Sequence, residues 1–418
     1  MSASAAPTVR RPRLALGGLA VAHTAAQAGN TITVFATPFY VRSIGGSAAD
    51  IGLATTAATL PIIIGGPLSG VLVDRLGHRR SSVLSDVVSG LTVLAIAVLG
   101  STGHLPLGGL LALLVASGLF DTPGATARTV LLPALSRDAG MPLERAVGLV
   151  SGAERTAMLA AAPLGGVLVA TVGPAEAFFV DAVLFAVSAL LVTALVPRRA
   201  SAAEDADDGP RVGYRRQLAD GVRFVLATPL LRHVALVVLV LNALDTARFS
   251  VLLPLYALEE LGGATAAGLV SGALAGGSVA GAALFSAWGH RLPRRALFVG
   301  AFVLTGGPLS AALALGGTTA PLVATAAAAG LFAGMLNPLI GTLRLELAPP
   351  HMLARVQTLM VSVAWAGIPV GALLAGVAAD ALDLHLLFAV LGVLYVLVAL
   401  APLAGGAWRQ MDSRPPAS

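Results

Sequence analysis

The sequence predicts an all-α membrane protein with twelve transmembrane helices, arranged as two pseudo-symmetric bundles of six. Three observations predict this fold: charged residues are scarce, apolar runs of membrane-spanning length recur along the chain, and the two halves repeat one another. Of the 418 residues, 56% are hydrophobic and 11% are charged, whereas soluble proteins are about 25% charged. So few charges cannot solvate a soluble fold of this size, and most of the surface must face lipid.

Twelve apolar segments are each long enough to cross about 30 Å of hydrocarbon at about 1.5 Å per residue. We place them at residues 14–40, 50–73, 81–101, 107–133, 145–171, 175–196, 230–257, 266–288, 296–316, 319–345, 355–379 and 384–404. The first segment follows three arginines and is too long for the apolar part of a cleavable signal peptide, so we interpret it as a helix that stays in the membrane.

The arginines indicate how the chain is oriented. All 26 basic residues are Arg, and the formal net charge is +5. If the N-terminus is cytoplasmic, the outside connections carry only Arg42, while the inside connections carry groups such as Arg75, Arg79 and Arg80 or Arg291, Arg294 and Arg295. This positive-inside pattern predicts a multi-pass cell-membrane protein with both termini in the cytoplasm. It also accounts for the net charge without a nucleic acid partner.

The two halves match at a constant offset of 216 residues. Matched positions include Pro38 and Pro254, Gly52 and Gly268, Arg75 and Arg291, and Arg128 and Arg344. We therefore expect two six-helix bundles, residues 1–196 and 230–418, with the substrate path between them. Residues 197–229 form a cytoplasmic linker. Its stretch from Tyr214 to Leu226 is amphipathic, and is either a helix on the inner membrane surface or a plain solvated helix.

The stretch "GVLVDRLGHRR", residues 70–80, places several charges between two apolar runs. It resembles the cytoplasmic signature of the major facilitator superfamily, and the resemblance extends over essentially the whole chain. The residues that match this signature are Gly70, Asp74, Arg75, Gly77, Arg79 and Arg80. The stretches "GLFDTPGATARTVLLPAL" (118–135) and "QLADGVRFVLATPLLR" (217–232) resemble the branch that includes enterobactin exporters and macrolide efflux proteins.

Two interpretations of this signature are open. It is either a topology anchor, because arginines pair with acids or lipid phosphates, or a gating latch that holds the halves together when the outside is open. The latch follows from the resemblance and from the position of Asp74, which can accept from free amides at the N-terminus of another helix.

The resemblance implies that the first, fourth, seventh and tenth helices line a cavity. Ionisable residues inside a membrane are costly and usually face water, a partner or a substrate. We expect Asp245 and Asp121 to be the candidates for proton coupling. Substrate-cavity candidates are Gln27, Asn30, Thr31, Phe35, Asn242, Arg248 and Asn337, and structural charge partners are Arg128, Glu154 and Arg344. For Arg128 we expect Asp74 or Glu154 as the partner.

Asp245 and Arg248 share a helical face because they are three residues apart. They form either a self-neutralised pair or an exchangeable proton site. The mostly aliphatic wall suits an amphipathic or bulky apolar ligand better than a sugar.

Several classes of protein are excluded or disfavoured. There is no Cys, which excludes thiolate metal sites and Cys nucleophiles. We find no nucleotide-binding loop, no histidine cluster with metal spacing and no hydrolase motif, so the sequence predicts neither an enzyme, a cofactor nor a metal.

We expect a secondary transporter that acts as a monomer and exports drug-like or amphipathic metabolites in exchange for protons. One alternative is an uptake permease or uniporter of a small organic solute with the same fold. An alternative of another class is a membrane receptor or assembly factor that transports nothing.

Overall fold

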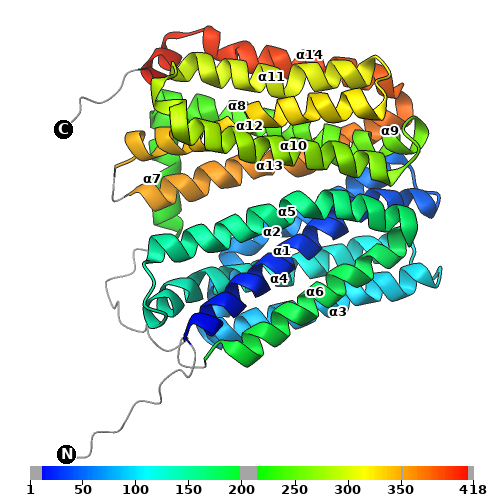
Figure 1. Ribbon diagram of the computed structural model, residues 1–418. Coiled ribbons are helices and arrows are strands. Elements are labelled where there is room, and N and C mark those ends of the chain that lie inside the picture. Colours follow the sequence, from blue (N-terminus) through cyan, green and yellow to red (C-terminus); the bar gives the residue numbers. More distant parts are fainter. Residues whose placement is uncertain (1–11, 198–213, 350–351, 413–418) are drawn as a thin grey trace, which may run out of the picture. The chain divides into compact units, whose positions relative to one another are not determined.

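The computed structural model describes residues 12–197, 214–349 and 352–412. Within these ranges the regular elements are helices (Figure 1). They divide into two compact units. Unit 1 contains residues 1–36, 57–161 and 172–208, and unit 2 contains residues 37–56, 162–171 and 209–418. Residues 37–56 and 162–171 belong to the unit that contains the C-terminal half. The expected bundles at residues 1–196 and 230–418 stay a prediction.

The first six helices agree closely with the first six expected spans. They are α1 (Pro12–Ser43), α2 (Ala48–Leu76), α3 (His78–Ser101), α4 (Leu107–Asp138), α5 (Leu143–Thr171) and α6 (Pro174–Leu195). In unit 1, α3 packs against both α4 and α6. Gly124 of α4 is needed at one of these contacts, because a Cβ there would lie 2.8 Å from Cβ of Ser85 on α3. Small residues allow helices to approach closely in this way.

The junction between α2 and α3 is a single residue, Gly77. Its φ angle is 77°, a left-handed conformation that glycine adopts without the steric cost of a side chain. The loop expected in the signature motif is therefore a one-residue turn, and Gly77 is required by its backbone geometry.

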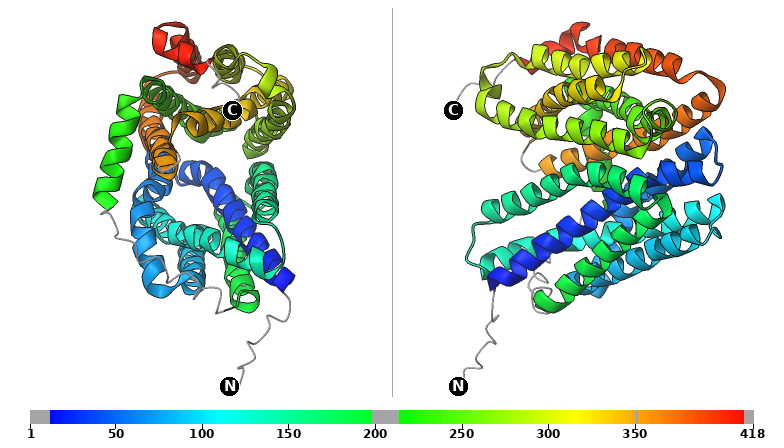
Figure 2. Two further views of the ribbon diagram at one scale, coloured as in Figure 1. Left: turned by 90° about the vertical axis from the view of Figure 1, so that its left-hand side faces the viewer. Right: turned by 45° about the vertical axis from the view of Figure 1, so that its right-hand side comes forward.

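The C-terminal half begins with α7 (Tyr214–Ala227), which lies crosswise to the other helices of its unit and packs against α8 and α13 (Figures 1 and 2). The remaining elements also follow the expected spans. They are α8 (Pro229–Thr246), η2 (Ala247–Leu252), α9 (Leu253–Glu259), α10 (Ala264–Trp288), η3 (Gly289–Arg291), α11 (Arg294–Ala314), α12 (Thr319–Leu347), α13 (Leu353–Ala381), α14 (Leu384–Leu400), η5 (Ala401–Leu403) and η6 (Gly406–Met411).

The seventh expected span is not one uniform α-helix. Residues Ala247–Leu252 form a π-helical stretch between α8 and α9. The amide of Leu253 donates to the carbonyl of Arg248, five residues earlier. Short π-helical segments of this kind are rare and frequently occur at functional sites. No signal in the hydrophobic pattern of residues 230–257 predicts it.

The helices have the length and the surface of membrane spans. Within the described ranges, ten helices are long and apolar enough to cross a membrane by length and composition. The two other expected spans are α1 and α5, with 32 and 29 residues, which carry more polar side chains. Large apolar side chains are exposed, including Leu190 and Leu374 at 67% each. An exposed apolar surface of this extent is expected to contact lipid.

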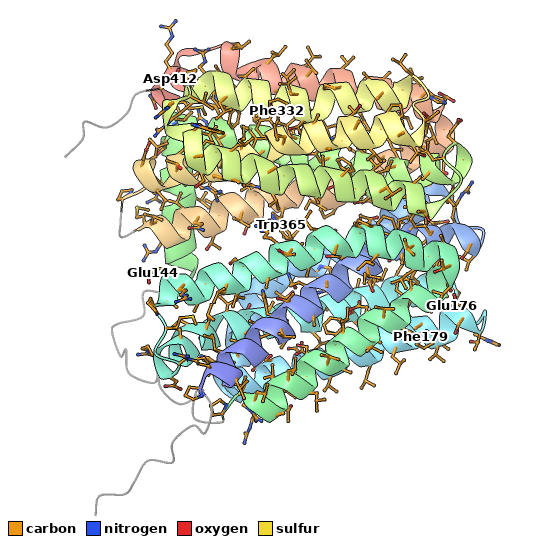
Figure 3. All side chains as sticks on the ribbon, viewed as in Figure 1. Glu144, Glu176, Phe179, Phe332, Trp365 and Asp412 are labelled. Atoms are coloured by element: carbon orange, nitrogen blue, oxygen red, sulfur yellow. The ribbon has the colours of Figure 1, made fainter. Side chains whose placement is uncertain are left out.

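Polar and apolar side chains are distributed along the helices as a membrane requires. Glu144 and Glu176 lie in the first turns of α5 and α6, and Asp412 follows η6. Figure 3 shows these three acids at the ends of helices, whereas Phe332 and Trp365 lie about midway along α12 and α13.

In unit 2, the start of α2 contacts the end of α13 through backbone hydrogen bonds. Asp380 of α13 accepts from the amides of Ala48 and Ala49 at 2.8 and 3.0 Å. These amides belong to the first turn of α2 and have no partner inside that helix. A carboxylate is favourable at this position because it also faces the positive end of the helix dipole.

Candidate functional site

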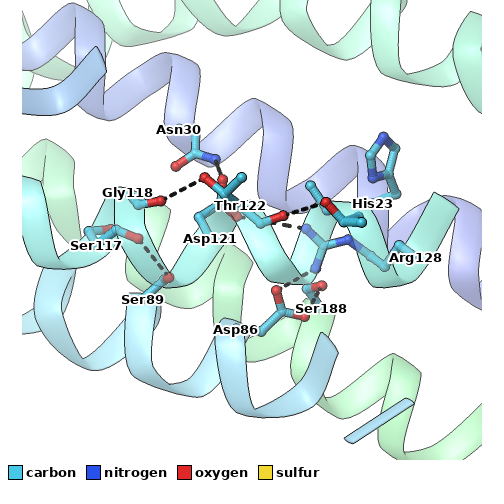
Figure 4. A network of polar contacts seen from close by, with 12 residues as sticks. His23, Asn30, Asp86, Ser89, Ser117, Gly118, Asp121, Thr122, Arg128 and Ser188 are labelled. Carbon is cyan, nitrogen blue, oxygen red and sulfur yellow. Dashed lines mark hydrogen bonds and ion pairs between the residues drawn. The ribbon is translucent and has the colours of Figure 1, made fainter. Parts of the chain in front are cut away.

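A fully buried ion pair joins α3 and α4 in unit 1. Arg128 is 1% exposed, and its Nη1 lies 2.5 Å from Oδ1 of Asp86. Ser188 of α6 donates from Oγ to the other carboxylate oxygen of Asp86 at 2.6 Å. One carboxylate therefore ties three helices together (Figure 4). Both of its oxygens are occupied, as a buried charge requires.

This geometry corrects one expectation. Among the described residues the buried partner of Arg128 is Asp86 and not Glu154, and the side chain of Asp74 lies outside the described residues. The third span thus contains a charged residue, Asp86, whose side chain is 0% exposed. A polar row at helical spacing within this span, Ser82, Ser85, Asp86 and Ser89, was the sequence signal.

Asp121 lies two turns before Arg128 on α4 but is held differently. Asn30 of α1 donates from Nδ2 to Oδ2 of Asp121 at 2.8 Å (Figure 4). The other oxygen, Oδ1, is 3.8 Å from Nη2 of Arg128. Among the described residues, neither of these two facing atoms has a hydrogen-bond partner. Asp121 is 15% exposed, so it is both more accessible and less fully bonded than Asp86.

Two further ionisable groups of unit 1 pair with α1. Thr33 of α1 donates to Oδ2 of Asp181 on α6 at 2.5 Å, and Asp181 is fully buried. Glu154 of α5 lies 3.4 Å from Nε2 of His23. The interhelical role expected for Glu154 therefore has a histidine partner, which the sequence analysis had not singled out.

Unit 2 contains a second buried arginine. Nη2 of Arg248 lies 2.5 Å from Oδ1 of Asp245, as the three-residue spacing predicted. The second Asp245 oxygen accepts from the hydroxyl of Tyr395 on α14 at 3.2 Å. The side chain of Asp245 is 32% exposed, whereas that of Arg248 is 1% exposed.

The remaining contacts of Arg248 are with α11 and with two aromatic rings. Its Nη1 donates to the Gly306 carbonyl at 2.9 Å and to Oγ of Ser310 at 3.0 Å. The guanidinium carbon lies 4.7 Å from the ring centroid of Phe249 and 5.3 Å from that of Tyr395. Such cation–π contacts stabilise a guanidinium away from water. Arg248 itself belongs to the π-helical stretch.

The other cavity candidates occupy partly exposed positions within their own units. Thr31 donates to the carbonyl of Gln27 in its own helix at 2.9 Å, and Phe35 is half-buried. In unit 2, Asn242 donates to the Ala364 carbonyl of α13 at 2.9 Å, and Asn337 is exposed. The structure thus brings together Asn30 with Asp121, and Asp245 with Arg248. The substrate role of all these residues stays a prediction.

The signature motif supplies a structural contact that repeats in both halves. Arg79 donates to the carbonyls of Val196 and Thr193 at the end of α6, at 2.7 and 2.6 Å. At the offset of 216 residues, Arg295 donates to the carbonyls of Pro402 and Leu403 after α14, at 2.9 and 2.8 Å. Both arginines therefore satisfy carbonyls left free at a helix C-terminus.

The other motif residues are less informative. Arg80 is exposed. The side chains of Gly70, Asp74 and Arg75 are outside the described set, so the latch stays a prediction. Arg344 is half-buried and its Nε donates to the Ile340 carbonyl of its own helix at 3.3 Å. An acidic partner for Arg344 also stays a prediction.

A family model described as Major Facilitator Superfamily matches residues 19–262 and 235–417. The chain belongs to the major facilitator superfamily. This membership establishes a multi-pass membrane transporter rather than an enzyme, with a small molecule as substrate. The finer resemblance to enterobactin exporters and macrolide efflux proteins stays a prediction.

Curated relatives align over nearly the full length of the chain. The multidrug efflux pump Tap of Mycolicibacterium fortuitum is 32% identical over 392 residues, which cover 93% of this chain and 94% of the relative. The multidrug efflux pump Tap of Mycobacterium tuberculosis (strain ATCC 25618 / H37Rv) is 30% identical over 402 residues, covering 94% and 93%.

Solved structures support the major facilitator fold. The nucleoside transporter NupG superimposes with a TM-score of 0.73 at 13% identity, covering 96% of this chain and 100% of that one. A bacterial homologue of the human lysosomal transporter Spinster gives a TM-score of 0.66 at 15% identity, covering 97% and 99%. At these identities the likeness concerns the fold alone.

Four contacts of these buried polar groups were not predicted from the sequence, and they involve Asp86, Ser188, His23 and Tyr395. Asp86 could have been found from the polar row in the third span. Ser188 and Tyr395 lie in mostly apolar stretches of α6 and α14, and nothing in a one-dimensional pattern distinguishes a buried hydrogen-bonding serine or tyrosine from a packing residue.

Proposed function

We propose that this chain exports drug-like or amphipathic metabolites from the cytoplasm in exchange for protons. The observation that supports export is the similarity to proteins named multidrug efflux pump Tap, at 32% identity over 93% of the chain. Both termini are cytoplasmic in this proposal, from the placement of the arginines. Transport proceeds by alternating access between the two six-helix halves.

Proton exchange is assigned to Asp121 and Asp245. Both are partly accessible carboxylates, 15% and 32% exposed, and both lie beside an arginine that is 1% exposed. A carboxylate next to such a fixed cation can lose its proton inside a membrane at a lower electrostatic cost. When the site faces the other side, a change in the distance to the arginine favours proton uptake.

Everted membrane vesicles from an efflux-deficient host test this proposal directly. Respiration acidifies the vesicle interior, and a panel of amphipathic cations and neutral drugs is added. We expect the wild type to dissipate the pH gradient when a transported compound is added. Asp245→Asn and Asp121→Asn should each lower this proton flux at least about tenfold, because removing the carboxylate removes the exchanging group.

A matched control is Asp383→Asn. Asp383 is the N-cap of α14 and accepts from the amide of Leu386, and Asn caps a helix about as well as Asp. This variant also removes a carboxylate, so wild-type proton flux is expected. Substrate movement without proton movement in the wild type would show a uniporter, and no movement of any compound would contradict export.

The cytoplasmic motif keeps its two possible roles, and a single substitution separates them. If Asp74 forms part of a latch, Asp74→Asn lowers the transport rate while the abundance of the protein in the membrane stays near normal. Unchanged transport would mean that the motif is a topology anchor. Its structural contribution would then include the hydrogen bond by which Arg79 caps the end of α6.

A further inference from the structure

The buried charges of unit 1 do not balance. Arg128 is the cation between two carboxylates of this network, Asp86 and Asp121. Its contacts with them are unequal, at 2.5 Å to Asp86 and 3.8 Å to Asp121 (Figure 4). Arg128 therefore interacts mainly with Asp86 and only weakly with Asp121.

Asp86 is fixed on every side. Its side chain is fully buried, one oxygen contacts Arg128 and the other accepts from Ser188. The close approach of α3 and α4 at Gly124 holds this pair in place. Both oxygens of Asp86 thus have partners inside the protein, and Asp86 is the fixed partner of Arg128.

Asp121 has the opposite properties. One oxygen accepts from Asn30, and the other faces Nη2 of Arg128 across 3.8 Å. Within the described part of the chain, both facing atoms lack a hydrogen bond. An unpaired buried donor that faces an unpaired acceptor is unfavourable. If Nη2 of Arg128 moved slightly closer to Oδ1 of Asp121, the two atoms would form a hydrogen bond. This bond would stabilise the ionised form of Asp121.

We propose that Asp86 is a positioning residue that holds Arg128 back from Asp121, so that Asp121 alone exchanges a proton in unit 1. This inference rests on the proposed proton-coupled export. Asp86 acts only through Arg128 and touches no substrate. Without Asp86, Arg128 would be free to pair fully with Asp121 and keep it ionised.

Other charged groups surround this network and stay unchanged in the test. His23 of α1 lies beside Glu154 of α5, and Asp181 of α6 accepts from Thr33. Together with Asp86 and Arg128, these are the titratable groups near Asp121 within the described part of the chain. Because the variants below alter only Asp86 and Arg128, the other groups contribute equally to every profile.

The experiment measures the pH profile of substrate-driven proton flux in everted vesicles for paired variants. In Asp86→Asn, Arg128 is released toward Asp121, and the half-maximal point should move to lower pH by about one unit or more. In the double variant Asp86→Asn/Arg128→Gln, Asp121 loses its cation, and the half-maximal point should move to higher pH. Asp86→Glu keeps the charge and should restore the wild-type position.

Shifts of the pH profile in opposite directions for Asp86→Asn and the double variant distinguish a positioning role of Asp86 from a structural one. A purely structural role would lower the abundance of both variants but leave their pH profiles alike. The double variant removes both charges of the Asp86–Arg128 pair and leaves Asp121 with its hydrogen bond from Asn30. Its profile can therefore be measured even if Asp86→Asn is present at low abundance. Shifts in one direction, or no upward shift in the double variant, would overturn the proposal.

Asp121→Asn measured in parallel separates this inference from the proposed function. If Asp121→Asn removes the pH-dependent flux while the two Asp86 variants do not shift in opposite directions, only the positioning role fails. If Asp121→Asn has the wild-type profile, the assignment of proton exchange to Asp121 fails, and the role of Asp86 fails with it.

Discussion

Among the described residues, each unit buries one arginine at 1% exposure, but the two units neutralise it in different ways. Arg128 of unit 1 contacts acids from two helices, and the nearer one is fully buried. Arg248 of unit 2 contacts an acid three residues earlier on its own chain segment, and its remaining bonds go to a carbonyl, a hydroxyl and two aromatic rings. The first arrangement fastens helices to one another, whereas the second presents a partly exposed carboxylate.

The internal repeat shows that the second half lacks an equivalent of the Arg128–Asp86 ion pair. At the offset of 216 residues, Arg128 corresponds to Arg344, but Asp86 corresponds to Phe302, which is buried in the core of unit 2. Arg344 therefore has a phenylalanine at the position equivalent to the acid, and its Nε bonds to its own helix. Unit 2 instead places its ion pair on the seventh span. The two halves thus pair a buried arginine with different residues.

The largest expected difference between the units concerns stability. Arg128→Gln leaves Asp86 charged and fully buried, so we expect a loss of about 3–5 kcal/mol in unfolding free energy. Arg248→Gln should cost less, because Asp245 is 32% exposed and retains Tyr395. Thermal unfolding of the purified proteins in detergent measures both. An equal loss for both variants would show that the exposure of the partner does not matter.

A smaller effect is expected from the hydroxyl groups that hold the two acids. Ser188→Ala removes the bond to Asp86 and leaves a fully buried oxygen unpaired, which should cost about 1–3 kcal/mol. Tyr395→Phe removes the bond to Asp245, whose carboxylate is partly exposed, so we expect little loss of stability but a shifted pH profile of transport. The comparison fails if Tyr395→Phe destabilises the protein more than Ser188→Ala.

The two arginines at the helix ends should behave alike. Arg79→Ala and Arg295→Ala each remove two hydrogen bonds to free carbonyls, and we expect a loss of about 1–2 kcal/mol in each case. Lysine substitutions, Arg79→Lys and Arg295→Lys, should recover part of the loss. If only Arg79→Ala impairs transport without a change in stability, the first copy of the motif has a gating role that the second lacks.

The smallest effect is expected at the surface pair of Arg294 with Glu346. Their two contacts, 2.6 and 2.8 Å, have ideal bidentate geometry, but the site is partly solvated. Arg294→Ala should cost about 0.2–1 kcal/mol, and added salt should reduce the difference from the wild type. A loss as large as that of Arg79→Ala would indicate that the pair is effectively desolvated.

The sequence predicts the helices of this protein well because membrane spans have a strong signal. Apolar length defined the twelve spans. Arg79 and Arg295, which are also separated by the offset of 216 residues, make equivalent contacts with carbonyls at helix ends. The pairing of Asp245 with Arg248 was also predictable, since both residues lie on one helix face. Contacts between helices were not, because they depend on rotation and depth. The contact of Arg128 with Asp86 depends on the approach of α3 and α4 at Gly124, for which the sequence gives no distance.

The π-helical stretch at Ala247–Leu252 should allow this transporter to tolerate the deletion of one residue within it. Such a segment contains a surplus residue relative to a regular α-helix, so loss of one amino acid there would let α8 and α9 continue as an uninterrupted rod. In-frame single-codon deletions, which elsewhere in a spanning helix rotate every later side chain out of place, should at this point still yield an inserted protein.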